Sequence, residues 1–179
     1  MNDSSNRAEE TSRVSIPIAV VLERTIDQSK RWVVPSWSIY TVVSDQNLDS
    51  LQQQVTVQDD GTTQRFFHGG LSLNLFKDGG EGYWYNLLSS DPYLFVVCEG
   101  EPGAMEIIPF YVTANQDEAM GHLETDDIVL SIPMPVDIRE LLEHYVLDHY
   151  EPVEKKKRKR RDWLQDSIRT SNQSQKKHD

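Results

Sequence analysis

Alternating apolar residues constrain the fold of this chain more than any other feature. The first such stretch places apolar side chains at every second position, namely Val14, Ile16, Ile18, Val20 and Leu22. A period of two residues is typical of a β-strand that buries one face. The chain is therefore expected to build a sheet whose inner face forms the core.

More strands are predicted between residues 32 and 75. Residues 32–43 fit one long kinked strand or a strand pair, with Trp37, Ile39 and Val43 on one face and Pro35 at an edge or bulge. Residues 55–58 and 64–68 form a short hairpin that turns at Gly61, and Gly69 and Gly70 follow as a second break. These breaks divide the region into short strands.

The next stretch is predicted as a hairpin. Its two arms carry alternating apolar side chains across a loop rich in Asp and Gly: Leu71, Leu73 and Leu75, then Tyr83, Tyr85 and Leu87. Residues 93–98 and 107–113 are more continuously apolar, which predicts the two most buried strands. Residues 127–132 are expected to form a further strand.

Two helices are predicted after residue 113. Asn115 and Glu118 have the spacing of an N-cap and its reciprocal acidic partner, which begins a helix of about two turns. A longer helix follows Pro135 and ends before Pro152. Its apolar stripe has helical spacing and comprises Ile138, Leu141, Leu142, Tyr145, Val146 and His149.

This order of elements predicts the α+β class: a mainly antiparallel sheet with a short helix and a C-terminal amphipathic helix. The pattern leaves a sandwich and an open barrel as alternatives. Residues 1–13 are expected to be a disordered N-terminus, residues 14–152 a single β-rich domain, and residues 153–179 a basic tail, disordered or helical.

Charge is distributed unevenly. The chain has 18 basic and 29 acidic residues, a net charge of −11. Seven of the basic residues are consecutive, which leaves a net charge of −18 on the rest: Lys155, Lys156, Lys157, Arg158, Lys159, Arg160 and Arg161. This basic block is predicted to bind an anionic partner. An acidic protein surface, nucleic-acid phosphates, anionic lipid and the acidic body of this chain are the four alternatives, beside a solvated tail.

No pattern in the chain predicts catalysis. The glycines lack the spacing of a phosphate-binding loop, and Cys98 is the single cysteine and is expected to be buried. Glu140 and His144 share a helix face, but one such pair falls short of a carboxylate metal site. His149 is predicted to cap the end of its helix. We expect no enzyme activity, no cofactor and no metal site.

The N-terminus lacks the pattern of a signal peptide, and no apolar run approaches the ~20 residues of a membrane span, so the expected location is the cytoplasm. The aromatic residues most able to form a ligand platform are Trp32, Trp37, Tyr83, Trp84 and Tyr85. Core packing is the favoured interpretation of these side chains.

The ordered residues resemble a bacterial family of uncharacterised proteins defined by a domain of unknown function. The matching segments are Ile16–Arg24, the Trp32 and Trp37 pair, Phe67–Leu75, Glu81–Leu87, Pro92–Val97, Val112–Ala114, Glu118–Ala119, Val129–Pro135 and the basic segment after Pro152. Proteins of this kind look like companions encoded beside molybdenum-dependent formate dehydrogenase genes. The resemblance implies an accessory role and offers no catalytic residues to transfer.

The favoured hypothesis is a non-catalytic adaptor that assists assembly, cofactor loading or docking of a formate dehydrogenase, with the basic block steering the encounter. One alternative is a carrier or enzyme of the molybdenum cofactor, with a pterin held near Trp32, Trp37 and Tyr85. Another is non-specific nucleic-acid binding through the basic tail.

Overall fold

A computed structural model describes residues 13–27, 29, 34–44 and 55–152. Its elements are β1 (Val14–Ile26), β2 (Pro35–Ser44), β3 (Val55–Asp59), β4 (Thr63–Leu75), the 3-10 turn η2 (Lys77–Gly79), α2 (Gly80–Leu88), β5 (Tyr93–Glu99), β6 (Ile108–Thr113), α3 (Gln116–Leu123), β7 (Ile128–Pro133) and α4 (Val136–His149). The strands form one sheet in the order β2-β1-β4-β6-β5-β7, with β3 paired to β4. The predicted α+β class is confirmed.

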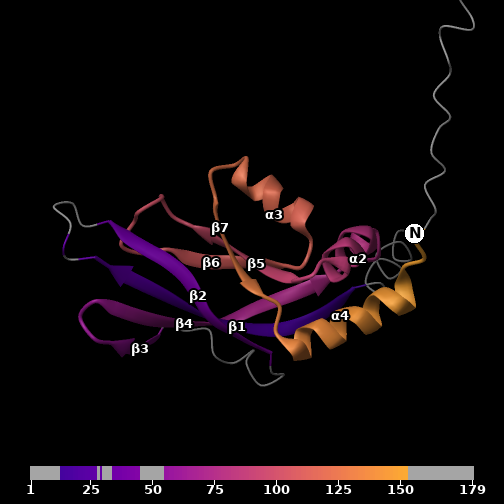
Figure 1. The fold of residues 1–179 in the computed structure, drawn as a ribbon, viewed down its shortest axis with the longest axis horizontal. Helices are drawn as coiled ribbons and strands as arrows, with labels where there is room; N and C mark the ends of the chain where they lie inside the picture. Colours follow the sequence, from indigo (N-terminus) through magenta and orange to yellow (C-terminus); the bar gives the residue numbers. More distant parts are fainter. Residues whose placement is uncertain (1–12, 28, 30–33, 45–54, 153–179) are drawn as a thin grey trace, which may run out of the picture.

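The sheet curls into a nearly closed barrel (Figure 1). Strands β2 and β7, at the two ends of the strand order, contact each other without a ladder of hydrogen bonds between them in the described chain. The structure thus resolves the alternative between sandwich and barrel in favour of the barrel. All pairs are antiparallel except β4 with β6, which run parallel with Leu73 opposite Val112.

The core lies inside this curled sheet. The inner side chains of β1 are fully buried at Ile18, Val20 and Leu22, as the two-residue period predicted. Strand β5 is buried from Leu94 to Cys98 and is confirmed as one of the most buried strands. The same expectation for β6 is wrong, because Ile108 and Phe110 in its first half are exposed and only its end, at Val112 and Thr113, is continuously buried.

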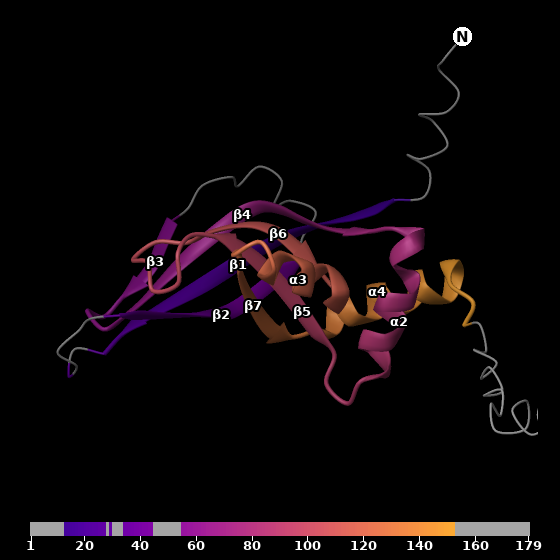
Figure 2. The same ribbon diagram turned by 90° about the horizontal axis from the view of Figure 1, so that it is seen from above.

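Helices α2 and α4 lie side by side at one end of the molecule (Figure 2). Helix α4 buries Ile138, Leu142, Tyr145 and Val146 in the same cluster that holds the inner residues of β1, β4 and β5. Tyr83 of α2 is fully buried and meets Tyr145 edge to face, with ring centroids 6.3 Å apart. The two helices therefore cover this end of the barrel.

The prediction of a strand through Tyr83, Tyr85 and Leu87 is wrong, since these residues belong to helix α2. Three aromatic residues in a row satisfy a period of two and a helical period equally well. The buried and partly buried positions of the segment have helical spacing, namely Gly80, Tyr83, Trp84 and Leu87. Gly80 and Gly82 pack closely against Tyr150 and Asn115, which favours the helix over the strand.

The predicted break at Gly69 and Gly70 is a β-bulge inside one continuous strand. Ile18 faces Leu71 and Val20 faces His68, so both glycines lie opposite Ala19. Gly70 has φ of +75°, a backbone conformation that glycine adopts without steric cost. Strand β4 therefore continues through Leu75 on the correct face.

The expectation that Val43 shares a face with Trp37 and Ile39 is wrong, because a second β-bulge interrupts β2. The pairing of β1 with β2 shifts between Thr41 and Ile39, which makes Tyr40 an additional residue. This shift turns Val42 inward and leaves Val43 exposed. Trp37 and Ile39 pack against the core as predicted, whereas Trp32 lies outside the described residues.

The N-cap of α3 is confirmed, but the role of its acidic partner is not. Asn115 accepts a hydrogen bond from the backbone N–H of Asp117. Glu118 instead accepts hydrogen bonds from the hydroxyls of Tyr111 (2.9 Å) and Thr113 (2.6 Å). These hydroxyl donors on β6 engage the carboxylate that a capping box would use, so Glu118 holds α3 against the strand.

Candidate partner-binding surface

The basic block predicted to bind a partner, Lys155–Arg161, lies outside the described residues. The structure does fix where the segment that carries it begins. Helix α4 ends at His149, and residues 151 and 152 follow it in the described chain. The surface beside this end of α4 is therefore the described surface nearest in sequence to the basic block.

An apolar groove lies between α2 and α4 at this end of the molecule. It has a volume of about 260 Å³ and is lined by Trp84, Leu87, Leu88, Glu143, Val146 and Leu147. Leu88 and Leu147 are 61% and 76% exposed. An apolar hollow with exposed leucines at its rim is characteristic of a surface that another chain covers. The groove is the candidate binding surface in the described part of the chain.

Glycine residues set the close packing that forms the groove. A Cβ atom at Gly80 would lie 3.0 Å from the Cβ of Tyr150, just after α4. Tyr150 in turn packs against Trp84, with ring centroids 6.4 Å apart. The start of α2 therefore lies against the end of α4, and the two helices run in opposite directions along the groove.

Asn86 fixes the other end of α2. Its side-chain amide donates to the carbonyl oxygens of Tyr93 and Ala114, both at 2.7 Å, and its Oδ1 accepts from the N–H of Tyr93 at 3.0 Å. These three bonds join the helix to β5 and to the start of α3. They hold Leu87 and Leu88 at the rim of the groove.

The groove has an acidic border. Glu140, Glu143 and Leu147 are spaced three to four residues apart, so they follow one face of α4, and Glu151 follows the end of the helix. Glu143 pairs with Arg139 at 2.8 Å, and both side chains are nearly half exposed. Such exposed pairs contribute little stability, so Glu143 keeps its ability to meet an incoming cation.

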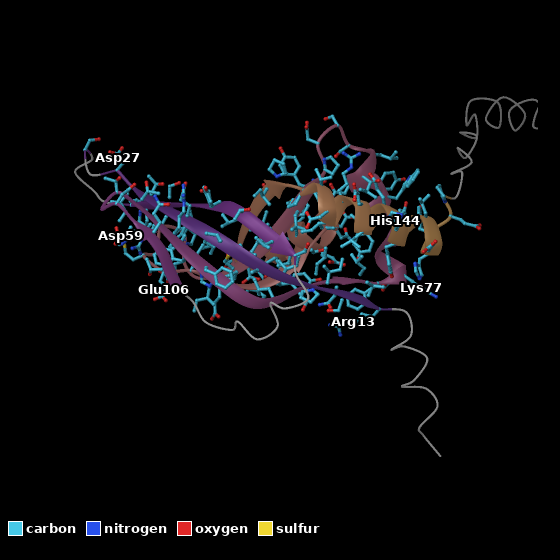
Figure 3. The ribbon with its side chains drawn as sticks, turned by 90° about the horizontal axis from the view of Figure 1, so that it is seen from below. Arg13, Asp27, Asp59, Lys77, Glu106 and His144 are labelled. Atoms are coloured by element: carbon cyan, nitrogen blue, oxygen red, sulfur yellow. The ribbon has the colours of Figure 1, made fainter. Side chains whose placement is uncertain are left out.

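Other acidic residues lie far from this groove. Figure 3 shows Asp27, Asp59 and Glu106 at one end of the molecule, and Arg13, Lys77 and His144 toward the other. At the first of these ends, the Asp59 carboxylate accepts hydrogen bonds from the Gln64 side chain and the Gly61 N–H, which lower its pKa. Hydrogen bonds from the N–H groups of Thr63 and Thr62 lower the pKa of Asp60. These carboxylates shape a turn.

A second hollow, of about 360 Å³, lies beside α3 and is lined by Tyr111, Glu118, Gly121, His122 and Thr125. His122 Nδ1 lies 2.8 Å from a carboxylate oxygen of Asp127, which follows the end of α3. Burial, with the hydrogen bond to Glu118, raises the pKa of Tyr111 to about 12. Tyr111 therefore remains a protonated donor at neutral pH. Its bond to Glu118 and the bond between His122 and Asp127 attach α3 to its neighbours.

The aromatic residues proposed as a ligand platform have different surroundings. The indole N–H of Trp37 donates to the carbonyl of Ala104 at 2.9 Å, and its ring lies against Phe66 and Arg24. Tyr85 is exposed on α2. Trp37 thus helps to attach the loop after β5 to the barrel.

The two histidines of α4 and the single cysteine, which were also considered as functional residues, make structural contacts. His144 and His149 each direct Nδ1 to the backbone carbonyl four residues earlier in α4, and His149 stacks on Tyr145. His149 thus lies at the helix end, as predicted. Cys98 is fully buried, and burial raises its pKa to about 12. Among the described residues, no three His, Cys, Asp or Glu side chains converge as a metal site.

Two features were not foreseen from the sequence. Leu88 and Leu147 lie off the predicted apolar stripes, and an apolar residue on the polar side of a helix was the available signal. His68 is 7% exposed, its Nε2 has no hydrogen-bond partner, and burial lowers its pKa. The sequence did not predict that His68 is buried. It was assigned to a short polar hairpin arm, and the β-bulge that follows it was not predicted.

None of the helices in the described ranges has the length and apolar character needed to cross a bilayer. A family model described as "Protein of unknown function (DUF3305)" matches residues 17–159, which is most of the chain. No curated protein and no solved structure gives a significant match. The matched range includes the whole groove and the first five residues of the basic block.

Proposed function

Because the chain belongs to the family described as "Protein of unknown function (DUF3305)", we propose that it is a non-catalytic adaptor that acts by binding another protein. The observation that carries this proposal is the exposed apolar groove between α2 and α4. Burying Leu88 and Leu147 under a partner removes apolar surface from water, which is the main source of binding energy at protein interfaces.

The basic block supplies the second part of the proposal. It begins six residues after the end of α4, and its seven positive charges would attract a partner that carries acidic residues. Such attraction chiefly raises the rate of association and weakens as salt increases. The acidic remainder of the chain disfavours nucleic acid and anionic membrane as partners.

The finer proposal is that the partner is a formate dehydrogenase subunit or its maturation machinery in the cytoplasm. It rests on the resemblance of the segments quoted above to companions encoded beside formate dehydrogenase genes. A molybdenum-cofactor carrier receives less support, because the Trp37 indole is already engaged by Ala104 and Phe66. A carrier would need an apolar cleft with converging polar groups.

The test is affinity capture from the source bacterium followed by mass spectrometry. Tagged full-length protein is compared with the double variant Leu88→Ser, Leu147→Ser and with the control Val136→Ser. Val136 is also on α4 and is 71% exposed, but it does not line the groove. We expect full-length protein and control to recover formate dehydrogenase subunits and the double variant to recover at least tenfold less.

Two results would contradict this proposal. Equal recovery with the double variant would exclude the groove as the binding surface. Absence of formate dehydrogenase subunits from every sample, with all variants folded by circular dichroism, would exclude the proposed partner.

A further inference from the structure

We propose that the groove between α2 and α4 is occupied, in the free protein, by the chain's own segment around Trp163, Leu164 and Ile168. This inference rests on the proposed function, because it concerns the same groove. A partner that binds there must displace this segment. It concerns this chain in particular, because the segment lies beyond the residues that match the family model.

The apolar residues of the segment suit the groove. Trp163, Leu164 and Ile168 are the large apolar residues after Pro152 other than Val153, in a stretch that is otherwise polar. At the 3.6 residues per turn of a helix they would lie within an arc of about 140°. Such a face matches the apolar hollow formed by Trp84, Leu88 and Leu147.

The connection is long enough for the segment to turn back. Ten residues lie between Pro152 and Trp163, and the eleven extended steps that join them reach about 36 Å. Helix α2, which forms one wall of the groove, has nine residues and is only about 13 Å long. Because the segment is tethered beside the groove, its effective concentration there is on the order of millimolar, so weak contacts suffice.

Charge favours the same arrangement. The 27 residues after Pro152 carry ten basic and four acidic residues, whereas residues 1–152 carry eight basic and 25 acidic residues. The connecting residues include the basic block, and they would pass Glu143, which lines the groove, and Glu140, which lies on the same face of α4. The same attraction would be screened within about 3 Å at 1 M salt.

The experiment is disulfide trapping in the full-length chain. Cysteines are introduced as Leu147→Cys with Leu164→Cys, and a control pair combines Val136→Cys with Leu164→Cys. Positions 136 and 147 are both highly exposed on α4, but 11 residues place them about 16 Å apart along the helix. The natural Cys98 is buried with a pKa of about 12, so it will not compete.

Copper phenanthroline is the oxidant, and mass spectrometry measures the intramolecular bond in the monomer. We expect the 147–164 pair to close at least tenfold faster than the 136–164 pair. The difference should decrease at 1 M salt and when residues 155–161 are all replaced by Gln, because both changes remove the charge attraction and leave the apolar contacts. Circular dichroism establishes that each variant is folded.

Equal closing rates for the two pairs at low salt would overturn the inference, as would a 147–164 bond formed only between two copies of the chain. The proposed function is tested separately by the capture of formate dehydrogenase subunits. Capture without trapping would remove only the inference, whereas trapping without capture would remove the partner and leave the docked segment. If both hold, Trp163→Ser with Leu164→Ser should increase capture at least threefold.

Discussion

Two glycines in neighbouring helices should respond in opposite ways to the same substitution. Alanine is favoured over glycine inside a helix by about 1 kcal/mol. At Gly121 in α3, a new Cβ would meet nothing within 4 Å. We therefore expect Gly121→Ala to raise the free energy of unfolding by about 0.5–1 kcal/mol, slightly less than the full value because the residue is close to the helix end.

Gly82 in α2 has a different neighbour. A Cβ there would lie 2.5 Å from Asn115 Oδ1, the atom that caps α3 by accepting from the N–H of Asp117 at 3.0 Å. Asn115 would have to move and lose this bond, at a cost of about 1 kcal/mol. The loss cancels or exceeds the gain from alanine, so Gly82→Ala should be neutral or destabilising.

Urea unfolding followed by circular dichroism measures the difference. For a slope of about 1–3 kcal/mol/M, a change of 1 kcal/mol moves the midpoint by roughly 0.3–1 M. Asn115→Ala removes the obstructing side chain, so Gly82→Ala added to that variant should stabilise it by about 1 kcal/mol. Stabilisation by Gly82→Ala in the natural sequence, equal to that of Gly121→Ala, would refute this account of how α2 and α3 pack.

Three further predictions concern single buried or half-buried groups. Burial lowers the pKa of His68, so the unfolded chain takes up the proton first as the pH falls below about 6.5. The free energy of unfolding of the natural protein should therefore fall on acidification below that pH. His68→Leu should reduce this dependence on pH, measured as the difference between urea unfolding at pH 5 and at pH 7.5. Cys98 should resist iodoacetamide at pH 8 in the folded protein and react on unfolding in urea, and rapid labelling of folded protein would contradict its burial. Asn86→Ala removes three hydrogen bonds and should lower the free energy of unfolding by about 2–3 kcal/mol, while Asn115→Ala, which removes one, should cost about 1 kcal/mol.

The sequence predicted the strands wherever one period dominated. The alternation from Val14 to Leu22 identified β1 and its inner face, and the spacing from Ile138 to Val146 identified α4. Both patterns are informative because the residues of one buried face belong to a single strand or helix, so their spacing can be read from the local sequence. The fold class follows from the order of such elements.

The errors arose where contacts distant in sequence decide the local structure. Helix α2 depends on Gly80 approaching Tyr150 and on Gly82 approaching Asn115, and neither contact can be read from residues 80–88. The bulges at Tyr40 and at Gly69 depend on pairing with β1. The groove was missed because its two walls are joined only in the folded chain.

The single parallel pairing has a consequence for the order in which the barrel forms and opens. Strands β1 to β4 make one antiparallel unit and β5 to β7 another. The parallel pairing of β4 with β6, with Leu73 opposite Val112, is the only hydrogen-bonded strand pairing between these units in the described chain. Amide protons along this seam should exchange with deuterium earlier than those inside either unit, because the short parallel pairing gives them less protection than the longer antiparallel ladders.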